Sequence, residues 1–520
     1  MGKGCESIDA TLLGKTKLMK STALSLLMLT IGFATYVNAQ ASGAQKNGLS
    51  SVSRPPAPHH LSPQPAFHPT TTVVKQDTSG VDSIYSALES AYQNNPELAT
   101  EITKINQADE RMPQAKAGYR PKVQGTLSVS ANKSINGGDQ KRLGISTTAQ
   151  SESLPTAQAG VEVTQNLYAG GATIASVKGA ENTIKAARAR LLILEQNIFS
   201  QVIQVILDML QKQSEIELYE GNVKLLKQTL NATNDKFTVG EETRTAVAQS
   251  QAQLADGVAQ LETSRAELEA LRATFTKLTG RQPKRLIKPD VTKDMPKTLE
   301  QAIQFATENN PTVIAARFEE AAARYEIDRV GAGLLPSIDL RGNTSYNASH
   351  NRSKFIGGAT LGTGDTRTDM SASVVMTVPL YEQGSVRSQK RSAHEAAAGA
   401  RISIETQRRI VTERLISAWQ NYLAAKTNIE NFKKQVEASK VSLDGTQQEM
   451  QVGTKILLDV LNAQKELLRS QLNLVRAERT YLFESFAVLA AMGRLTAKQM
   501  KLKVNYYDPS IHYNNTKGRI

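Results

Sequence analysis

The chain has 520 residues, a formal net charge of +13, and only 5% aromatic residues. Its single cysteine excludes a disulfide within the chain and a CxxC motif. The excess of Lys and Arg is spread among Glu and Gln at helical spacing, without interleaved aromatic residues. This pattern favours solvated helix faces and disfavours a nucleic-acid-binding protein.

The N-terminus has the pattern of an export signal. Lysines precede an apolar run over residues 23–34, and small residues lead up to Ala39. The alternative is a membrane anchor, but the run is shorter than the ~20 apolar residues that a spanning helix needs. We expect residues 1–39 to be a signal peptide, whose cleavage removes Cys5. Residues 40–80, rich in Pro, Ser and His, are expected to be a disordered leader.

After Ala39 the sequence shows no apolar run that suggests a transmembrane helix, so a membrane-embedded part would have to consist of strands. The remaining sequence is duplicated. Asn95-Pro96 recurs 215 residues later as Asn310-Pro311, and Val239-Gly240 recurs 213 residues later as Val452-Gly453. A repeated order of elements indicates one duplicated architecture in place of several unrelated domains.

We therefore expect a first structural repeat over residues 81–294, a second over 295–500, and a C-terminal tail over 501–520. Each repeat opens with short helices, in which Asn95 and Asn310 suit the N-cap and the following proline suits the first turn. Two segments of alternating apolar and polar residues then predict two strands in each repeat. These strands are expected at about 119–133, 157–168, 336–347 and 370–381.

Each strand has one apolar and one polar face, which two architectures explain. A small soluble sheet would bury the apolar face, whereas a membrane barrel would turn it toward lipid and its polar face toward water. Four strands cannot close a barrel alone, because the smallest membrane barrels have about eight.

Long helices follow each pair of strands. Residues 173–239 and 386–452 contain no proline, and their apolar residues recur at helical spacing. Gly240 and Gly453 mark turns into a second helix. We expect long helices at about 172–239 and 242–280 in the first repeat, and at about 385–452 and 455–493 in the second. Helices of this length need partners along their whole length, which indicates coiled-coil packing.

Enzyme chemistry is not indicated. The sequence has no HExxH motif, phosphate-binding loop or nucleophile elbow, and no catalytic residue, metal site or cofactor is predicted.

In the order and spacing of its elements, the chain resembles the TolC family of outer-membrane channels over about residues 82–496. The resemblance is carried by the paired Asn-Pro helix starts, the run Leu380–Gly384, and the turn sequences over 237–245 and 452–461. It implies a mainly α protein with a membrane β-barrel, in which duplicated halves each supply two strands and long coiled-coil helices. It further implies a homotrimer that forms an α/β barrel tunnel.

The resemblance also assigns site residues at the tips of the helix hairpins. The family's acidic ring at the periplasmic constriction maps onto Asp459, and its second acid maps onto Asn462, which has lost the charge. The tyrosine and arginine that latch the tip in relatives map onto Met450 and Lys455. In the first repeat, Ala246 stands where relatives often have an aspartate. The hairpin turns, as expected docking positions for an adaptor, are Gly240, Glu241, Glu242, Thr243, Arg244, Gly453 and Thr454.

The family implies a passive duct in the outer membrane of a Gram-negative bacterium, with its helical tunnel in the periplasm. Its expected partners are a periplasmic adaptor (membrane fusion protein), an inner-membrane pump of the RND or ABC type, and outer-membrane lipid. The cargo would be small molecules, proteins or both. The alternative from another class is a periplasmic or cell-surface coiled-coil scaffold or adhesin without a pore.

Overall fold

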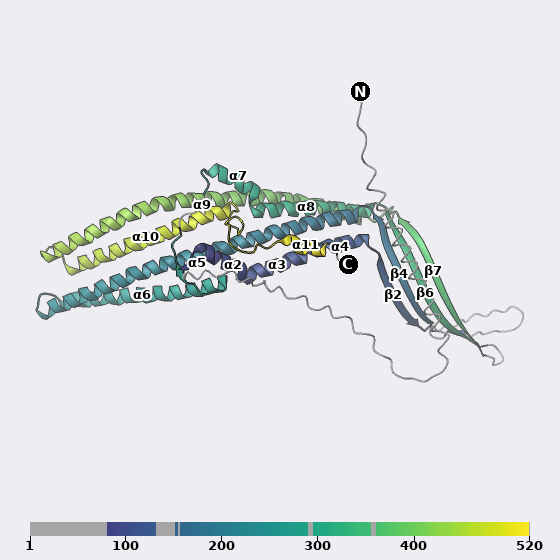
Figure 1. The fold of residues 1–520 in the computed structure, drawn as a ribbon, viewed down its shortest axis with the longest axis horizontal. Helices are drawn as coiled ribbons and strands as arrows, with labels where there is room; N and C mark the ends of the chain where they lie inside the picture. Colours follow the sequence, from purple (N-terminus) through teal and green to yellow (C-terminus); the bar gives the residue numbers. More distant parts are fainter. Residues whose placement is uncertain (1–80, 132–150, 154–155, 290–294, 355–359, 519–520) are drawn as a thin grey trace, which may run out of the picture. The chain divides into compact units, whose positions relative to one another are not determined.

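The computed structural model of the chain describes residues 81–131, 151–153, 156–289, 295–354 and 360–518. The predicted signal peptide and leader lie outside these residues. Figure 1 shows the long helices running side by side, and the strands following one another in a single curved sheet.

The first repeat contains α2 (Ile84–Asn94), α3 (Pro96–Asp109), α4 (Arg111–Lys116), the 3-10 turn η1 (Ala117–Tyr119), β2 (Lys122–Ser130), β3 (Ser151–Ser153), β4 (Thr156–Ala169), α5 (Ala172–Thr238) and α6 (Arg244–Thr279). The second contains α7 (Leu299–Asn309), α8 (Pro311–Gly331), the 3-10 turn η2 (Ala332–Leu334), β6 (Ser337–Lys354), β7 (Thr360–Thr377), α9 (Ser385–Gln451) and α10 (Leu457–Ala491). A two-residue parallel pair joins β1 (Val81–Asp82) to β5 (Arg285–Leu286), and α11 (Pro509–Thr516) follows near the C-terminus. The predicted fold class, a duplicated α/β architecture with long helices, is confirmed.

The two repeats share hydrogen bonds as well as element order. The Asn95 side chain accepts from Glu97 N at 2.8 Å and donates to Leu278 O at 3.1 Å. The equivalent Asn310 accepts from Thr312 N at 2.9 Å and donates to Ala491 O, also at 2.9 Å. Each buried asparagine therefore caps one helix and ties its start to the end of the returning long helix of the same repeat.

The antiparallel pairing of β2, β4, β6 and β7 confirms the predicted separation of faces. Val123 pairs with Val163, which pairs with Gly342, and Gly342 pairs with Ala372. Since directly paired residues point to the same side of a sheet, this row is apolar throughout. The neighbouring row, Gln124, Glu162, Asn343 and Ser371, is polar throughout.

The second-repeat strands are longer than predicted. β6 and β7 have 18 residues each, and they pair from Ser337 with Thr377 to Lys354 with Thr360. Their outer ends contain Asn, Ser, Thr and Arg without an apolar row, so the alternation that predicts a strand is absent there. At the other end, Leu380 and Tyr381, expected at the end of the strand, lie beyond the last paired residue.

The helices α5 and α9 have 67 residues each, which at 1.5 Å per residue corresponds to about 100 Å. Among the described residues, α5 alone has a window apolar enough to cross a membrane by length and composition, with a mean hydropathy of 1.3. This finding differs from the expectation that no apolar run after Ala39 suggests a transmembrane helix. Because 56% of the window is buried within the fold, its apolar residues serve as core.

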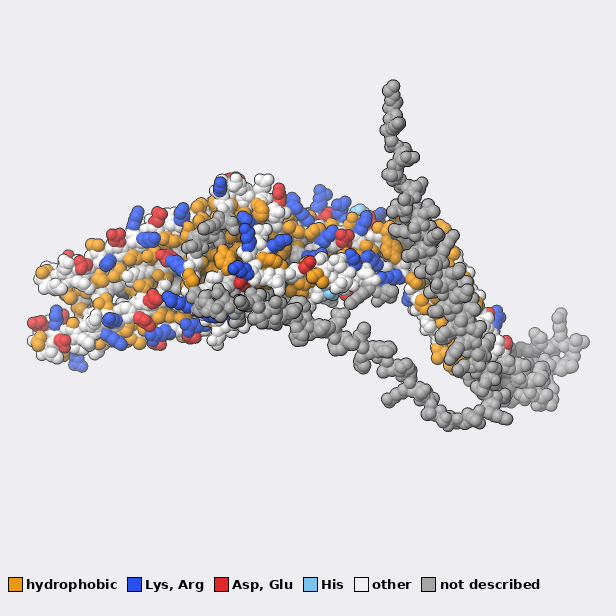
Figure 2. Space-filling view, viewed as in Figure 1, with side chains coloured by type: hydrophobic (Ala, Val, Ile, Leu, Met, Phe, Trp, Pro, Cys, Tyr) orange, Lys and Arg blue, Asp and Glu red, His pale blue; other side chains and the backbone are white. Residues whose placement is uncertain are grey.

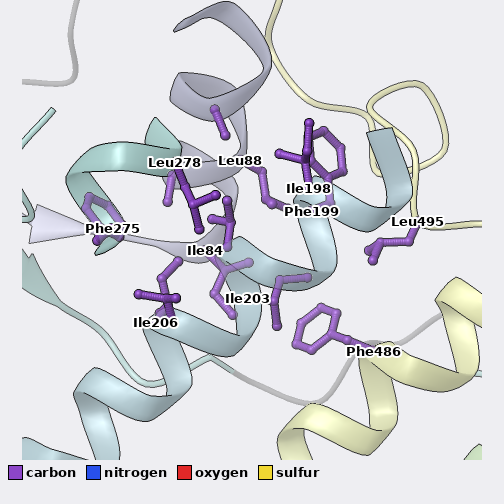
Figure 3. Close-up of a cluster of buried hydrophobic side chains, with 14 of the residues drawn as sticks. Ile84, Leu88, Ile198, Phe199, Ile203, Ile206, Phe275, Leu278, Phe486 and Leu495 are labelled. Atoms are coloured by element: carbon purple, nitrogen blue, oxygen red, sulfur yellow. The ribbon is translucent and has the colours of Figure 1, made fainter. Parts of the chain in front are cut away.

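The largest core lies where α2, α5, α6, α10 and the chain after α10 meet (Figure 3). Ile84 and Leu88 from α2, Phe199 and Ile203 from α5, Phe275 from α6 and Phe486 from α10 are buried there. Leu495, after α10, belongs to the same cluster. This core fixes the long helices of both repeats to one another.

Residues 495–518, which we name the C-terminal strap, are bound to the first repeat along their length. Lys503 N donates to Glu89 Oε1 at 2.8 Å, and Tyr507 N donates to Tyr92 OH at 3.1 Å. His512 Nδ1 lies 3.0 Å from Oδ2 of the buried Asp109. The sequence predicted only a tail over 501–520, without contacts.

Candidate functional site at the hairpin turns

The turn between α5 and α6 ends its first helix at a glycine. Gly240 has φ +82°, a left-handed conformation that costs glycine little. Its N–H donates to Phe237 O at 3.1 Å, and Glu241 N donates to Lys236 O at 2.9 Å. This pair of bonds is a Schellman cap, which satisfies the last carbonyl groups of α5.

The turn between α9 and α10 repeats the same bonds. Gly453 has φ +81°, its N–H donates to Met450 O at 3.1 Å, and Thr454 N donates to Glu449 O at 2.9 Å. The Thr454 hydroxyl also donates to Glu449 O, at 2.8 Å. The glycines singled out in the sequence therefore set the direction of each hairpin.

The two returning helices begin differently. In the first repeat, the Thr243 hydroxyl caps α6 by accepting from Ala246 N at 3.1 Å. In the second, the cap position is Ile456, which has no side-chain acceptor, and Asp459 Oδ2 instead accepts from Ile456 N at 3.3 Å. A carboxylate in the first turn is also favoured by the helix dipole, so Asp459 stabilises the start of α10.

An apolar cluster joins the two hairpins close to these turns. It contains Leu226, Ala246, Leu457 and Leu461, with Met450 packed against it. Met450, predicted as a gate residue, therefore contributes an apolar contact. Ala246, in the first turn of α6, is buried in the same cluster.

The other polar and charged residues of the predicted site are exposed or half-buried at the tips. Asn462, Lys455, Glu241 and Arg244 are exposed, whereas Asp459 and Glu242 are half-buried. Within the described part of the single chain, none of these charged side chains is in an ion pair. The structure therefore brings Met450 and Ala246 together and leaves the predicted gate charges unpaired at the tips.

Higher on the hairpins, the structure contains a charged network around one buried acid, which sequence reasoning missed. Glu215 on α5 is 1% exposed and accepts from Lys212 at 2.6 Å and from Arg476 of α10 at 3.3 Å. Lys212 also lies 2.6 Å from Glu267 of α6. Burial raises the pKa of Glu215, but hydrogen bonds from Lys212 and Gln211 outweigh it, so the pKa lies below its usual value. The network ties three helices together, and its only sequence signal was an acid on an apolar helix face.

A second buried acid, Glu195 on α5, lies in the core. It is 4% exposed and accepts a hydrogen bond from Ala497 N of the strap. Burial raises the pKa of Glu195 to about 7, although the bond from Ala497 lowers it. Among the described residues, no group of three or more His, Cys, Asp or Glu side chains is arranged to hold a metal ion.

Comparison with known proteins places these features in one family. The model of the outer membrane efflux protein family matches residues 87–281 and 302–494. The outer membrane efflux protein BepC of Brucella suis is 30% identical over 86% of this chain and 93% of its own length. The outer membrane protein TolC of Escherichia coli is 25% identical over 81% of this chain and 84% of its own.

Solved structures agree on the fold. The Campylobacter jejuni CmeC outer membrane channel has a TM-score of 0.66 at 15% identity, covering 84% of this chain and 89% of its own. VceC, an outer membrane protein of Vibrio cholerae, has a TM-score of 0.64 at 18% identity, covering 79% and 96%. All four are outer membrane proteins by name, of which BepC is named as an efflux protein and CmeC as a channel.

Proposed function

The chain belongs to the outer membrane efflux protein family, and from that premise we propose that three copies share one barrel. The protein is an outer-membrane channel of the kind used in efflux and type I secretion, and its helical tunnel lies in the periplasm. The comparisons give no support to the alternative of a pore-free scaffold or adhesin.

One observation supports the shared barrel most strongly. The four long strands form a sheet whose outer strands, β2 and β7, each have one unpaired edge among the described residues. Exposed backbone groups at such edges cannot face lipid, because every backbone group in a bilayer core needs a partner. Pairing β2 of one copy with β7 of the next satisfies both edges, and three copies would close twelve strands.

The exposure of the apolar face supports lipid contact. Leu127 is 80% exposed, Val129 is 71% exposed and Val374 is 65% exposed. A contiguous apolar surface of this kind is rare on a soluble protein and matches the outer face of a membrane barrel. The polar rows would then line a water-filled passage, through which cargo moves without energy from this chain.

We place the gate of this passage at the hairpin tips. Asp459 would supply the charge of the constriction, Asn462 the neutral position beside it, and Met450 and Lys455 the contacts that hold the tip closed. The position of Asp459 at the start of α10, directly after the second hairpin turn, supports its role in the constriction. The turn residues at Gly240–Arg244 and at Gly453 and Thr454 would dock a periplasmic adaptor, which couples the channel to an inner-membrane pump of the RND or ABC type.

The remaining divisions of the chain are proposed as follows: a signal peptide at 1–39, a leader at 40–80, and repeats at 81–294 and 295–500. The predicted tail at 501–520 overlaps the C-terminal strap, and we propose that it acts as part of this cover over the first repeat.

A crosslink between copies tests the shared barrel. Removal of Cys5 with the signal would leave Leu127→Cys on β2 and Val374→Cys on β7 as the only thiols of a double variant. A short bifunctional thiol reagent should convert detergent-purified protein into covalent trimers, and either single variant should not. A monomer that conducts ions in bilayers, or crosslinking only within one copy, would contradict the proposal.

A further inference from the structure

Basic side chains recur along one face of α9. With 100° of turn per residue, they fall within an arc of about 100°. They are Arg387, Lys390, Arg391, Arg401, Arg408 and Arg409. The first repeat keeps only part of this feature: Lys178 and Arg188 are equivalent to Arg391 and Arg401, but Ile174 and Val177 stand in place of Arg387 and Lys390.

This face is on the side of the helical layer that also carries α7. Arg317 and Arg324 share a face of α8. Arg317 donates to Thr307 O of α7 at 3.3 Å, and Arg324 and His394 of α9 line a common hollow of about 310 Å³. Figure 2 shows Lys and Arg in blue along this edge, between α7 and the strands. Because α7 would narrow a tunnel that it entered, we place α7, and with it the basic face of α9, on the outside of the tunnel.

The first three basic residues are close to the membrane boundary. Leu380 is 94% exposed and Tyr381 is 85% exposed, and they lie between the end of β7 and the start of α9 at Ser385. Tyrosines at this position are typical of the interface between lipid and water. Arg391 lies about 9 Å along the helix from Ser385, whereas Arg401 lies about 24 Å from it.

Screening by salt distinguishes the first three basic residues of α9 from the three that lie farther along the helix. At physiological salt the Debye length is about 8 Å, so a headgroup attracts only the charges within the first two turns or so. Among the described residues, no ion pair neutralises Arg387, Lys390 or Arg391. By contrast, Arg408 and Arg409 pair with Glu405 at 3.9 and 3.1 Å.

We propose that Arg387, Lys390 and Arg391 bind the anionic headgroup of a phospholipid, such as phosphatidylglycerol, in the periplasmic leaflet of the outer membrane. The two guanidinium groups can each donate two parallel hydrogen bonds to phosphate oxygens, and the lysine adds a point charge. The acyl chains then lie along the apolar face of the sheet. This inference rests on the proposed membrane channel.

The test uses trimers reconstituted in phosphatidylcholine nanodiscs with stepwise additions of phosphatidylglycerol. Native mass spectrometry after detergent transfer counts the phosphatidylglycerol that stays bound. Each basic residue near a charged membrane surface changes the affinity about fivefold, so Arg387→Gln with Lys390→Gln and Arg391→Gln should lower it on the order of a hundredfold. Glycerol phosphate at the same phosphate concentration should not displace the lipid, because it lacks acyl chains.

The matched control removes the same charge from the same helix, farther from the membrane. Arg401→Gln with Arg408→Gln and Arg409→Gln should leave the bound lipid unchanged, and Arg387→Lys with Arg391→Lys should retain most of it. A heat-modifiable trimer band verifies that each variant is assembled.

Equal lipid binding by the first triple variant and wild type would overturn the proposal. So would equal losses in both triple variants, or a shift in ion selectivity with unchanged lipid binding, since that shift places these residues in the lumen. Conductance of the wild type in phosphatidylcholine bilayers is scored separately. If it is absent, the proposed channel fails; if it is present and lipid binding does not change, only this inference fails.

Discussion

The helices α5 and α9 have equal length and equivalent positions in the duplication, but their surroundings differ. Twenty residues of α5 are buried, against seven of α9. The difference arises because α2, α3, α4 and the C-terminal strap all pack on α5, whereas α7 is the short helix that packs on α9. On α9, Ile402 and Val441 remain 67% and 68% exposed.

A duplicated backbone therefore does not imply a duplicated surface. The first repeat supplies most of the largest apolar core and its buried acids. The second carries an exposed helix that suits contact with a neighbouring copy, together with a basic face near the membrane. The hairpin tips show the same division: their turn geometry is shared, and their caps and charges differ.

The largest expected effect is a pH-dependent change in stability at Glu195 of α5, which the equivalent residue of α9 should not show. A raised carboxyl pKa means that folded Glu195 keeps its proton where the unfolded chain has lost it. Below about pH 4.5 the carboxyl is protonated in both states, so its raised pKa does not lower the free energy of unfolding. The free energy of unfolding then falls as pH rises to about 7, where the folded carboxyl ionises. From that shift the full penalty is about 3 kcal/mol, as an order of magnitude.

Glu195→Gln should therefore stabilise the trimer by about that amount at pH 8 and hardly at all at pH 4. The change is measured as the shift of the unfolding midpoint in guanidinium at several pH values. Arg408→Gln, at the equivalent exposed position of α9, should show no such pH dependence. A pH-independent effect of Glu195→Gln would mean that the carboxyl does not titrate in this range.

The next effect distinguishes the two tips. Three copies of Asp459 at a narrow point should attract cations, and a trivalent cation added from the periplasmic side should block the current. Asp459→Ala should weaken this block about tenfold, which corresponds to about 1.4 kcal/mol. Asn462→Asp should strengthen it, because it restores a second acid.

Two controls in planar bilayers sharpen this result. Asp459→Asn keeps a hydrogen-bond acceptor for Ile456 N but removes the charge, so it should match Asp459→Ala in cation block. Glu241→Gln removes an exposed acid from the first turn and should leave the block unchanged. If Asp459→Ala leaves the block intact, the constriction lies elsewhere.

The smallest effect concerns the helix caps. Ile456 already has the extended cap conformation of Thr243, with φ −97° and ψ 163°. Ile456→Thr should therefore stabilise the start of α10 by about 1 kcal/mol, and Thr243→Ala should destabilise that of α6 by about as much. Hydrogen exchange of the first-turn amides measures both. Faster exchange in Ile456→Thr would show that its hydroxyl does not reach the amides.

The sequence predicted the parts of the fold that depend on local pattern. The Asn-Pro helix starts, the turn glycines and the alternation of β2 each have a local physical signature, and the structure contains them at the expected places. It did not predict the outer half of β6, where polar residues pair without an apolar row. It also missed the strap, because the contact of Glu195 with Ala497 joins residues 302 positions apart.

At the candidate site, sequence reasoning placed Asp459 and Lys455 on the tips but not the packing around them. The capping role of Asp459 follows from Ile456 at the cap position, which could have been inferred from the sequence. The cluster that buries Ala246 with Met450 could not, because it depends on how the two hairpins meet.

The face of the sheet that lines water is tested most directly by thiol labelling during single-channel recording. Cysteines at Ser128 and Asn343 lie on the polar face, whereas cysteines at Val129 and Leu340 lie on the apolar face. A charged, membrane-impermeant thiol reagent should reduce the current through the first pair of variants and leave the second pair unchanged. Labelling of Val129→Cys and Leu340→Cys with no effect at Ser128→Cys and Asn343→Cys would contradict the account, because the apolar face would then line the pore.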